Sequence, residues 1–483
     1  MVAVVCLGCP RPAQPMPGCA NISVPVLKRK RINQMIKKLG PACLIALVLI
    51  TALGFYMRCE SVSETKVTKP LRSDALDYFC YAYNLRHKGT YSREGLVLSD
   101  IGAPASPDAV RSPGYPLFLL PFVDSPPTHA MLGKIVLTQA VLSTLTILIA
   151  FFFFLKFLPR PASLVATLLT ALSPHLIVGN SYILSESLFC FLLVLSAWAS
   201  SLLPKSPSPL RAGLTGLSMG LASLVRPVLQ YLPVAMFIPL IRDFGRAKGL
   251  KLGAFLLLGC MLALSPWLTR NMSVQDKPGD NNLMIDFLHH GIYPDFMFNN
   301  DPNSYAFPYR FDPRTPQIGA NLGSVLKEVL TRFIDQPAPH LKWFLVGKPV
   351  EFWSWNTVQG VGDAFIYPIS STPYTNRRLF AWTHSCMYYL HWPLVALCLL
   401  GSLLAWHSSA MRVFEPATAG VTRLASCYVL YFTLVHMIGA PFPRYAFPLR
   451  PFQFGMAVFT VVLIHRHARN RFRRSAHGVS AAS

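Results

Sequence analysis

The chain alternates between long uncharged stretches and short charged ones. Three stretches are the clearest, 39–57, 135–155 and 252–269, and each is followed by a basic residue, Arg58, Lys156 or Arg270. Each approaches the ~20 apolar residues that a helix needs to cross a bilayer. Weaker stretches bring the prediction to about ten spans; they cover 161–179, 187–203, 212–225, 228–241, 388–406, 424–440 and 451–465.

Composition supports a membrane protein. Of the 483 residues, 52 % are hydrophobic and 13 % are charged, whereas soluble domains carry about 25 % charged residues. The apolar content also excludes a disordered chain. The net charge is +23, from 44 Lys and Arg less 21 Asp and Glu, but the basic residues flank the apolar stretches, where they set topology. We therefore expect an all-α polytopic protein that has the lipid bilayer as a partner and binds no nucleic acid.

Basic clusters orient the chain in the membrane. One cluster, between Lys28 and Lys38, precedes the first span, and another, between Arg466 and Arg474, follows the last. Basic residues concentrate on the cytoplasmic side, so we expect both termini in the cytoplasm. A bacterial inner membrane is the preferred location, and an endoplasmic-reticulum membrane would keep the same topology.

The spans divide the chain into five expected parts. Amphipathic aromatic residues such as Trp343, Trp353 and Trp355 lie at headgroup depth, so the outer loops should carry interfacial helices. The parts are a basic, Pro-rich cytoplasmic tail (1–38), an N-terminal transmembrane region (39–269) that contains a long outer loop (58–130), an outer-face loop region (270–387), C-terminal transmembrane helices (388–465) and a basic cytoplasmic tail (466–483).

The first outer loop holds the most informative carboxylate. Residues 74–87 can form a helix, with Ser73 or Asp74 as its N-cap and Asp77 one turn further on. Asp74 can be a plain helix cap, or a general base that the helix dipole keeps ionised at the membrane surface. Residue type alone leaves both interpretations open.

Five short motifs resemble those of the GT-C glycosyltransferases, in particular the bacterial protein O-mannosyltransferase-like and lipid A aminoarabinose transferase-like group. They follow one another in the order seen in that group and cover about 65–450. The motifs are Asp74 and Tyr78 followed by Pro113-Gly114-Tyr115-Pro116, then Glu186 within Leu184-Ser185-Glu186-Ser187, Arg226-Pro227, Pro266-Trp267-Leu268-Thr269-Arg270-Asn271, and Arg444-Tyr445-Ala446-Phe447-Pro448.

The resemblance implies a fold, a reaction and a set of site residues. The fold would be a GT-C-like bundle, and the reaction would move a sugar from a polyprenyl-phosphate donor, with inversion, to an acceptor at the outer face. Asp74 would be the catalytic residue, with Glu186 in support. Arginine offers a planar fork that matches a phosphate, so the donor phosphate would be held by Arg111, Arg226, Arg270 and Arg444. Secondary candidates are Asp77, Tyr78, Tyr115 and Tyr445.

The chain departs from the group at one position. The aminoarabinose transferases have an acid where this chain has Arg111. This replacement argues against a shared metal site and against the aminoarabinose donor. The metal is therefore unknown, a divalent cation remains open, and the acceptor can be a glycan, a lipid or a protein.

Two other function classes fit a polytopic membrane protein. A transporter or flippase of lipid-linked sugars would carry charges buried in mid-span and internal symmetry, and the clear spans hold no charge at their centre. A non-catalytic envelope scaffold is not excluded by any feature of the sequence. Arginines at the ends of spans also serve as plain anchors.

Overall fold

The computed structural model describes residues 39–94, 105–124, 126–275, 279, 282–358 and 361–480. The expected tail 1–38 and the last three residues lie outside this part of the chain. The chain divides into two units, Met1–Ala46 and Leu47–Ser483. In the first, the described residues include the start of helix α2 (Pro41–Glu64). All other described helices and strands belong to the second unit.

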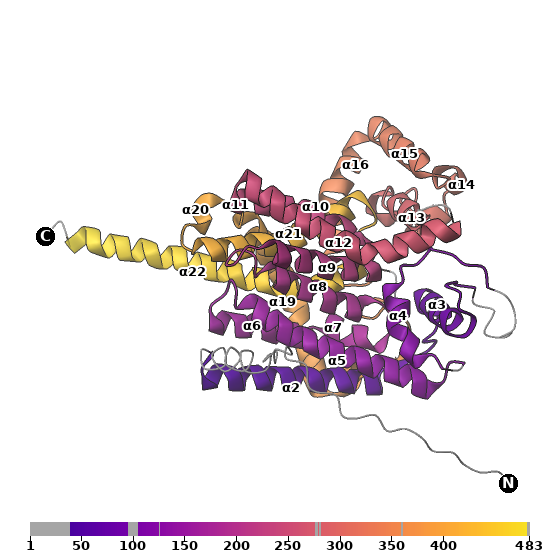
Figure 1. Cartoon of the computed structure of the whole chain (residues 1–483), viewed down its shortest axis with the longest axis horizontal. Helices are drawn as coiled ribbons and strands as arrows, with labels where there is room; N and C mark the ends of the chain where they lie inside the picture. The colour runs from indigo at the N-terminus through magenta and orange to yellow at the C-terminus, as the bar shows by residue number, and fades with distance from the viewer. Residues whose placement is uncertain are drawn as a thin grey trace, which may run out of the picture. The chain divides into compact units, whose positions relative to one another are not determined.

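The described chain is almost entirely helical, as the sequence predicted. Helices α5, α6 and α22 lie roughly parallel to one another (Figure 1). The principal α-helices are α3 (Asp74–Lys88), α4 (Gly114–Leu119), α5 (His129–Phe154), α6 (Arg160–Leu172), α7 (Pro174–Val178), α8 (Glu186–Ser200), α9 (Pro209–Val225), α10 (Leu232–Ala235), α11 (Phe237–Phe244), α12 (Arg246–Gln275), α13 (Asn282–His290), α14 (Thr315–Ile318), α15 (Leu322–Asp335), α16 (Pro337–Lys342), α17 (Lys348–Phe352), α18 (Pro373–Asn376), α19 (Arg378–Leu404), α20 (Ser408–Met411), α21 (Pro416–Ile438) and α22 (Arg450–Ser480).

Shorter elements join these helices. A π-helical turn, η8 (Trp343–Gly347), connects α16 to α17. Two short strands, β1 (Lys66–Val67) and β2 (Ile369–Ser371), pair antiparallel. The 3₁₀ helices are η2 (Leu120–Phe122), η3 (Gly179–Ser181), η4 (Pro227–Tyr231), η5 (Pro294–Phe296), η6 (Pro302–Ser304), η7 (Pro308–Arg310) and η9 (Pro443–Leu449).

Six helical segments in the described residues are long and apolar enough to cross a membrane: α2, α5, α12, α19, α21 and the run Pro443–Arg471. A seventh would combine α6 with Pro174–Ser181, across a bend of 51°. The chain is thus an all-α polytopic membrane protein, while the figure of ten spans remains a prediction. Helices α8 and α9 match two expected spans but are short, at 15 and 17 residues.

The prediction of a single spanning helix over 228–241 is wrong. It is divided into η4, α10 and α11. Pro233 and Pro239 lie within this segment and lack a backbone N–H, which disfavours a continuous helix there. Two other boundaries move: α12 continues to Gln275, and α19 starts at Arg378, ten residues before the expected 388.

Glycine lets α9 and α12 approach closely. A Cβ atom at Gly216 would lie 1.7 Å from the backbone oxygen of Leu256, and one at Gly259 would lie 2.0 Å from the backbone oxygen of Gly213. Small residues at such contacts are typical of helix pairs in membranes. The close packing of α9 against α12 fixes the end of α9, which Arg226 directly follows.

Arg58 does not end the first span as the sequence suggested. It lies inside α2, is fully buried, and donates hydrogen bonds to Ser143 Oγ at 2.8 Å and to the backbone oxygen of Ala171 at 2.9 Å. Ala171 belongs to the last turn of α6, just before the bend at Pro174. A cation at a helix C-terminus satisfies carbonyl groups that have no partner within the helix, so Arg58 stabilises the broken span.

Candidate active site

Asp74 begins helix α3 and turns its side chain toward two arginines. Ser73 occupies the N-cap position with φ at 47°, and its side chain makes no capping hydrogen bond. Asp74 Oδ1 lies 2.7 Å from Arg111 Nη2, and Oδ2 lies 3.0 Å from Arg444 Nη2. The carboxylate therefore binds arginines from two distant segments, and its side chain does not act as a helix cap.

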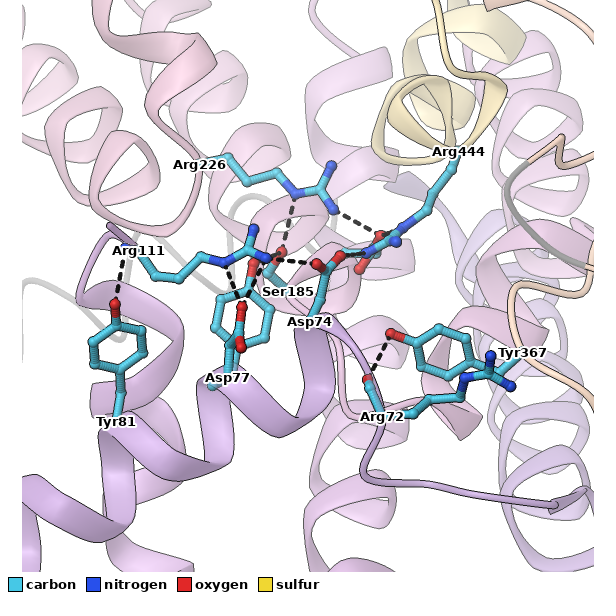
Figure 2. Close-up of polar contacts among 11 residues, drawn as sticks. Arg72, Asp74, Asp77, Tyr81, Arg111, Ser185, Arg226, Tyr367 and Arg444 are labelled. Atoms are coloured by element: carbon cyan, nitrogen blue, oxygen red, sulfur yellow. Dashed lines mark hydrogen bonds and ion pairs between the residues drawn. The ribbon is translucent and has the colours of Figure 1, made fainter. Parts of the chain in front are cut away.

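The two arginines extend this pairing in opposite directions (Figure 2). Arg111 also binds Asp77, with Nη2 at 2.9 Å and Nε at 3.2 Å from Oδ2. Arg444 also donates from Nε to Glu186 Oε1. Charge-assisted contacts of this kind are about twice as strong as neutral ones, so the start of α3 is held firmly against the start of α8.

Arg226 completes the network at the end of α9. Its Nη2 lies 2.7 Å from Glu186 Oε1, and its Nε donates to Ser185 Oγ at 3.0 Å. Three carboxylates and three guanidiniums thus alternate, with a net charge of 3 − 3 = 0. We call this set the ion-pair network; its members are Asp77, Arg111, Asp74, Arg444, Glu186 and Arg226.

Asp74 and Asp77 have the most exposed side chains of the ion-pair network. The side chains of Asp74 and Asp77 are 27 % and 28 % exposed, whereas those of Arg444 and Glu186 are 8 % and 4 % exposed. A molecule that approaches from solvent therefore reaches Asp74 before it reaches Glu186. Asp74 and Asp77 therefore form the more accessible end of the ion-pair network, and Glu186 lies at its buried part.

The charges around Asp74 fix its protonation state. Burial alone would raise the pKa of this carboxyl, but the guanidiniums of Arg444 and Arg111 outweigh that effect and hold the pKa at about 2. Asp74 is therefore ionised at neutral pH. Burial alone would lower the pKa of Arg111, but the carboxylates of Asp74 and Asp77 outweigh that effect and raise this pKa above its usual range.

Some polar atoms of the ion-pair network have no partner within the described residues. Glu186 Oε2 is buried and has no hydrogen-bond partner there. Arg111 and Arg226 each make their contacts through Nε and Nη2, and no acceptor in that part of the chain binds either Nη1. Figure 2 shows each of these nitrogens without a dashed line. The site thus offers N–H donors beside an ionised carboxylate.

The secondary tyrosines surround the ion-pair network. Tyr78 packs edge-to-face on Tyr115, with ring centroids 4.9 Å apart, and the guanidinium of Arg111 lies 5.7 Å from the Tyr78 ring centre. Tyr445 lies under Arg226 at 5.5 Å. Tyr115 is fully buried and donates to Gln139 Oε1 at 2.6 Å, so it belongs to the packing beneath the site.

Within the part of the chain that the structure describes, Arg270 forms no ion pair with a member of the ion-pair network. It donates to the backbone oxygens of Asp108 at 2.6 Å and Tyr91 at 3.2 Å, and its guanidinium packs on the rings of Tyr91 and Trp267. Tyr91 in turn donates to the backbone oxygen of Arg111 at 3.0 Å. Arg270 therefore holds the loop that carries Arg111. Its position at a span end in the sequence could not show this, because the partners are backbone groups of a distant loop.

Tyr367 belongs to none of the motifs found in the sequence, yet it contacts the segment that leads into α3. Its hydroxyl donates to the backbone oxygen of Arg72 at 3.2 Å, and the Arg72 guanidinium lies 5.5 Å from its ring centre (Figure 2). The β1–β2 pairing reinforces this link between the two loop regions. Tyr367 and Arg72 are 295 positions apart, and no local motif signals their contact.

The carboxylates do not form a metal site. No group of three or more His, Cys, Asp or Glu side chains suited to a metal ion occurs among the residues that the structure describes. The oxygens of Asp74 and Glu186 that have partners bind arginine. Among the described residues, these carboxylates therefore do not fit the divalent cation that the family resemblance left open.

Comparisons with known proteins give structural likenesses only. No protein-family model matches the chain, and no curated protein matches it. Matching solved structures include the apo form of the Archaeoglobus fulgidus oligosaccharyltransferase, with 12 % identity over 90 % of this chain and 52 % of that chain, at a TM-score of 0.49.

Two further matches come from the same organism. The oligosaccharyltransferase tethered to an acceptor peptide with the NVT sequon has 11 % identity over 87 % of this chain and 49 % of that chain, at a TM-score of 0.49. AglB in complex with an inhibitory peptide and a dolichol-phosphate has 11 % identity over 92 % and 54 %, at a TM-score of 0.46. The chain spans about half the length of the chains it matches. At these values the likeness assigns neither an activity nor a substrate to this chain.

Proposed function

We propose that this chain is a membrane glycosyltransferase that moves a sugar from a polyprenyl-phosphate donor to an acceptor at the outer face of the membrane. The observation that carries the proposal is the setting of Asp74. Its carboxylate is ionised, 27 % exposed and paired with Arg111 and Arg444, and Arg111 has an Nη1 group without a partner among the described residues. A base beside anion-binding groups is what transfer from a phosphate-linked sugar requires.

Asp74 would act as the general base. The acceptor oxygen attacks the anomeric carbon on the face opposite the phosphate, which accounts for inversion. As the new C–O bond forms, the acceptor proton passes to the carboxylate of Asp74. The bond between the anomeric carbon and the phosphate oxygen breaks, and its electron pair leaves with the polyprenyl phosphate.

Arg111 and Arg226 would bind the donor phosphate through Nη1. The leaving phosphate gains negative charge in the transition state, so cations placed beforehand stabilise it more than they stabilise the bound donor. Glu186 binds both Arg226 and Arg444, so its proposed role is to position them.

The proposed location of the reaction is inferred from the distribution of basic residues along the sequence. We place both termini in the cytoplasm and the site at the outer leaflet, in a bacterial inner membrane. The acceptor class (glycan, lipid or protein) is left for experiment. Arg270 is not proposed as a phosphate ligand, because its contacts are with backbone oxygens of the loop around Asp108.

The test is donor cleavage in vesicles. Purified wild-type protein is reconstituted with a panel of polyprenyl-phosphate sugars and a membrane extract as the acceptor source, and mass spectrometry follows each sugar-lipid and the released polyprenyl phosphate. We expect one donor to be converted to polyprenyl phosphate by the wild type and not by Asp74→Asn. If a donor moves between leaflets with its sugar–phosphate bond intact, the protein is a flippase and the proposal is wrong.

A further inference from the structure

Helix α15 exposes a regular row of large apolar side chains. Leu322, Leu326, Leu330 and Ile334 are 37 %, 51 %, 65 % and 78 % exposed. With 3.6 residues per turn, side chains four positions apart lie on one side of a helix. These four residues therefore form a single aliphatic stripe, which we call the α15 stripe.

The α15 stripe is not the side that holds the helix to the protein. Val325 is fully buried and packs with Ile285 and Ile318. Arg332 lies 2.7 Å from Glu328 and 3.2 Å from Asp312, which fixes the same side through ion pairs. The helix is therefore anchored without the stripe. A row of exposed aliphatic side chains of this length marks an interaction surface.

The helical segment that follows carries a similar surface. Along α16, η8 and α17, the exposed large apolar residues are Leu341, Leu345, Val346 and Val350, at 53 %, 56 %, 56 % and 49 %. Figure 1 shows α15 joined to the rest of the second unit through α16. The two helical segments thus present aliphatic side chains one after the other.

Contacts with α21 set the depth of this surface. Lys348 of α17 donates to the backbone oxygen of Ile438 at 3.0 Å, and Ile438 is the last residue of the membrane-spanning helix α21. Phe352 stacks on His436, with ring centroids 4.4 Å apart. On α21 itself, Leu434 and Ile438 are 57 % and 64 % exposed. The segment is therefore fixed where a lipid-facing span ends, at the boundary between lipid and water.

The chemistry of the α15 stripe favours lipid over a protein partner. Protein interfaces are enriched in Tyr, Trp and Arg anchors, whereas the stripe consists of Leu and Ile alone. Away from the α15 stripe, the helix exposes Thr331 and Asp335, which lie about 120° and about 160° around it from the middle of the stripe. A helix that is aliphatic on one side and polar on another, and that α16 and α17 connect to the end of a span, has the pattern of an interfacial helix.

We infer that α15 lies in the surface of the phospholipid bilayer, with the α15 stripe among the acyl chains and headgroups and with Thr331 and Asp335 toward water. This contact holds the region around 282–352 against the membrane. The inference rests on α15 and α21 and is independent of the proposed glycosyl transfer.

The test is site-specific photo-crosslinking in phospholipid vesicles. The photoreactive residue p-benzoylphenylalanine replaces Leu326, Leu330 or Ile334 in turn, and the matched control is Thr331, which is exposed on the same helix but on its polar side. Ile438, on α21, is the positive control for lipid contact. Only variants that elute from a sizing column like the wild type are irradiated, and lipid adducts are measured by mass spectrometry of the intact protein.

We expect lipid adducts at the stripe positions in several-fold higher yield than at Thr331. Equal yields at Thr331 and the stripe would overturn the inference, because they would show lipid contact without orientation. Protein–protein adducts at Leu330 and Ile334, or no lipid adduct there while Ile438 gives one, would also overturn it. Each outcome is independent of whether any sugar donor is cleaved.

Discussion

Replacing Asp74 by Asn is the sharpest test of the proposed chemistry. The amide has nearly the same shape as the carboxylate but cannot take up a proton at neutral pH. The fold should survive, because Arg111 keeps its contact with Asp77 at 2.9 Å and Arg444 keeps its contact with Glu186. The net charge of the ion-pair network rises from 0 to +1, which leaves the attraction for a donor phosphate in place.

The size of the effect follows from the role assigned to Asp74. General base catalysis contributes about 10²–10⁴-fold to a rate, which corresponds to about 3–5 kcal/mol of activation free energy. We therefore expect kcat to fall by about 10²–10⁴-fold in Asp74→Asn. The KM for the donor should change by only a few-fold, because the arginines stay in place.

Asp77→Asn is the matched control. Asp77 lies on the same helix, binds the same arginine and has a side chain 28 % exposed, against 27 % for Asp74. It contacts Arg111 but not Arg444, so its loss should lower kcat far less. Release of polyprenyl phosphate is measured for both variants at equal amounts of folded protein. If Asp77→Asn loses as much activity as Asp74→Asn, or if Asp74→Asn loses less than about tenfold, Asp74 is not the general base.

Three further predictions concern pH, stability and positioning. Burial opposes ionisation of Asp74, but the neighbouring guanidiniums hold its pKa at about 2. Protonation of Asp74 should therefore cause no decrease of kcat/KM between about pH 7 and about pH 5. A decrease in this range that Asp74→Asn removes would contradict the assignment. Arg444→Gln takes one of two arginines from Glu186, which is 4 % exposed and keeps Arg226; the loss should therefore stay below the about 3–5 kcal/mol of a fully broken buried pair, the Tm in detergent should still fall, and an unchanged Tm would refute this role. Tyr367→Phe removes the 3.2 Å hydrogen bond to Arg72; such a bond contributes about 1 kcal/mol to stability, so the Tm should fall slightly with an unchanged pH profile, and an unchanged Tm would refute the role of Tyr367 in joining the two loop regions.

The main elements could be predicted because their signal is local. Helices α2, α5 and α12 follow uncharged stretches that any segment of that length must bury in lipid or protein. Helix α3 starts at Asp74, where a Ser-Asp pair precedes an amphipathic run. The prediction of one helix over 228–241 was wrong, because it followed the apolar content of the segment and not the effect of Pro233 and Pro239 on backbone hydrogen bonding.

The sequence by itself determined that the chain is helical and membrane-spanning, and it singled out Asp74, Glu186 and Arg444 as residues of interest. Only the tertiary structure decided that these three lie together. Asp74 and Arg444 are 370 positions apart, and their contact depends on how α3, α8 and η9 pack. The structure likewise separated Arg270 from the ion-pair network and buried Arg58 against the end of α6. Hydropathy is a property of each segment, whereas the partner of a charge is set by packing between segments, which no local pattern encodes.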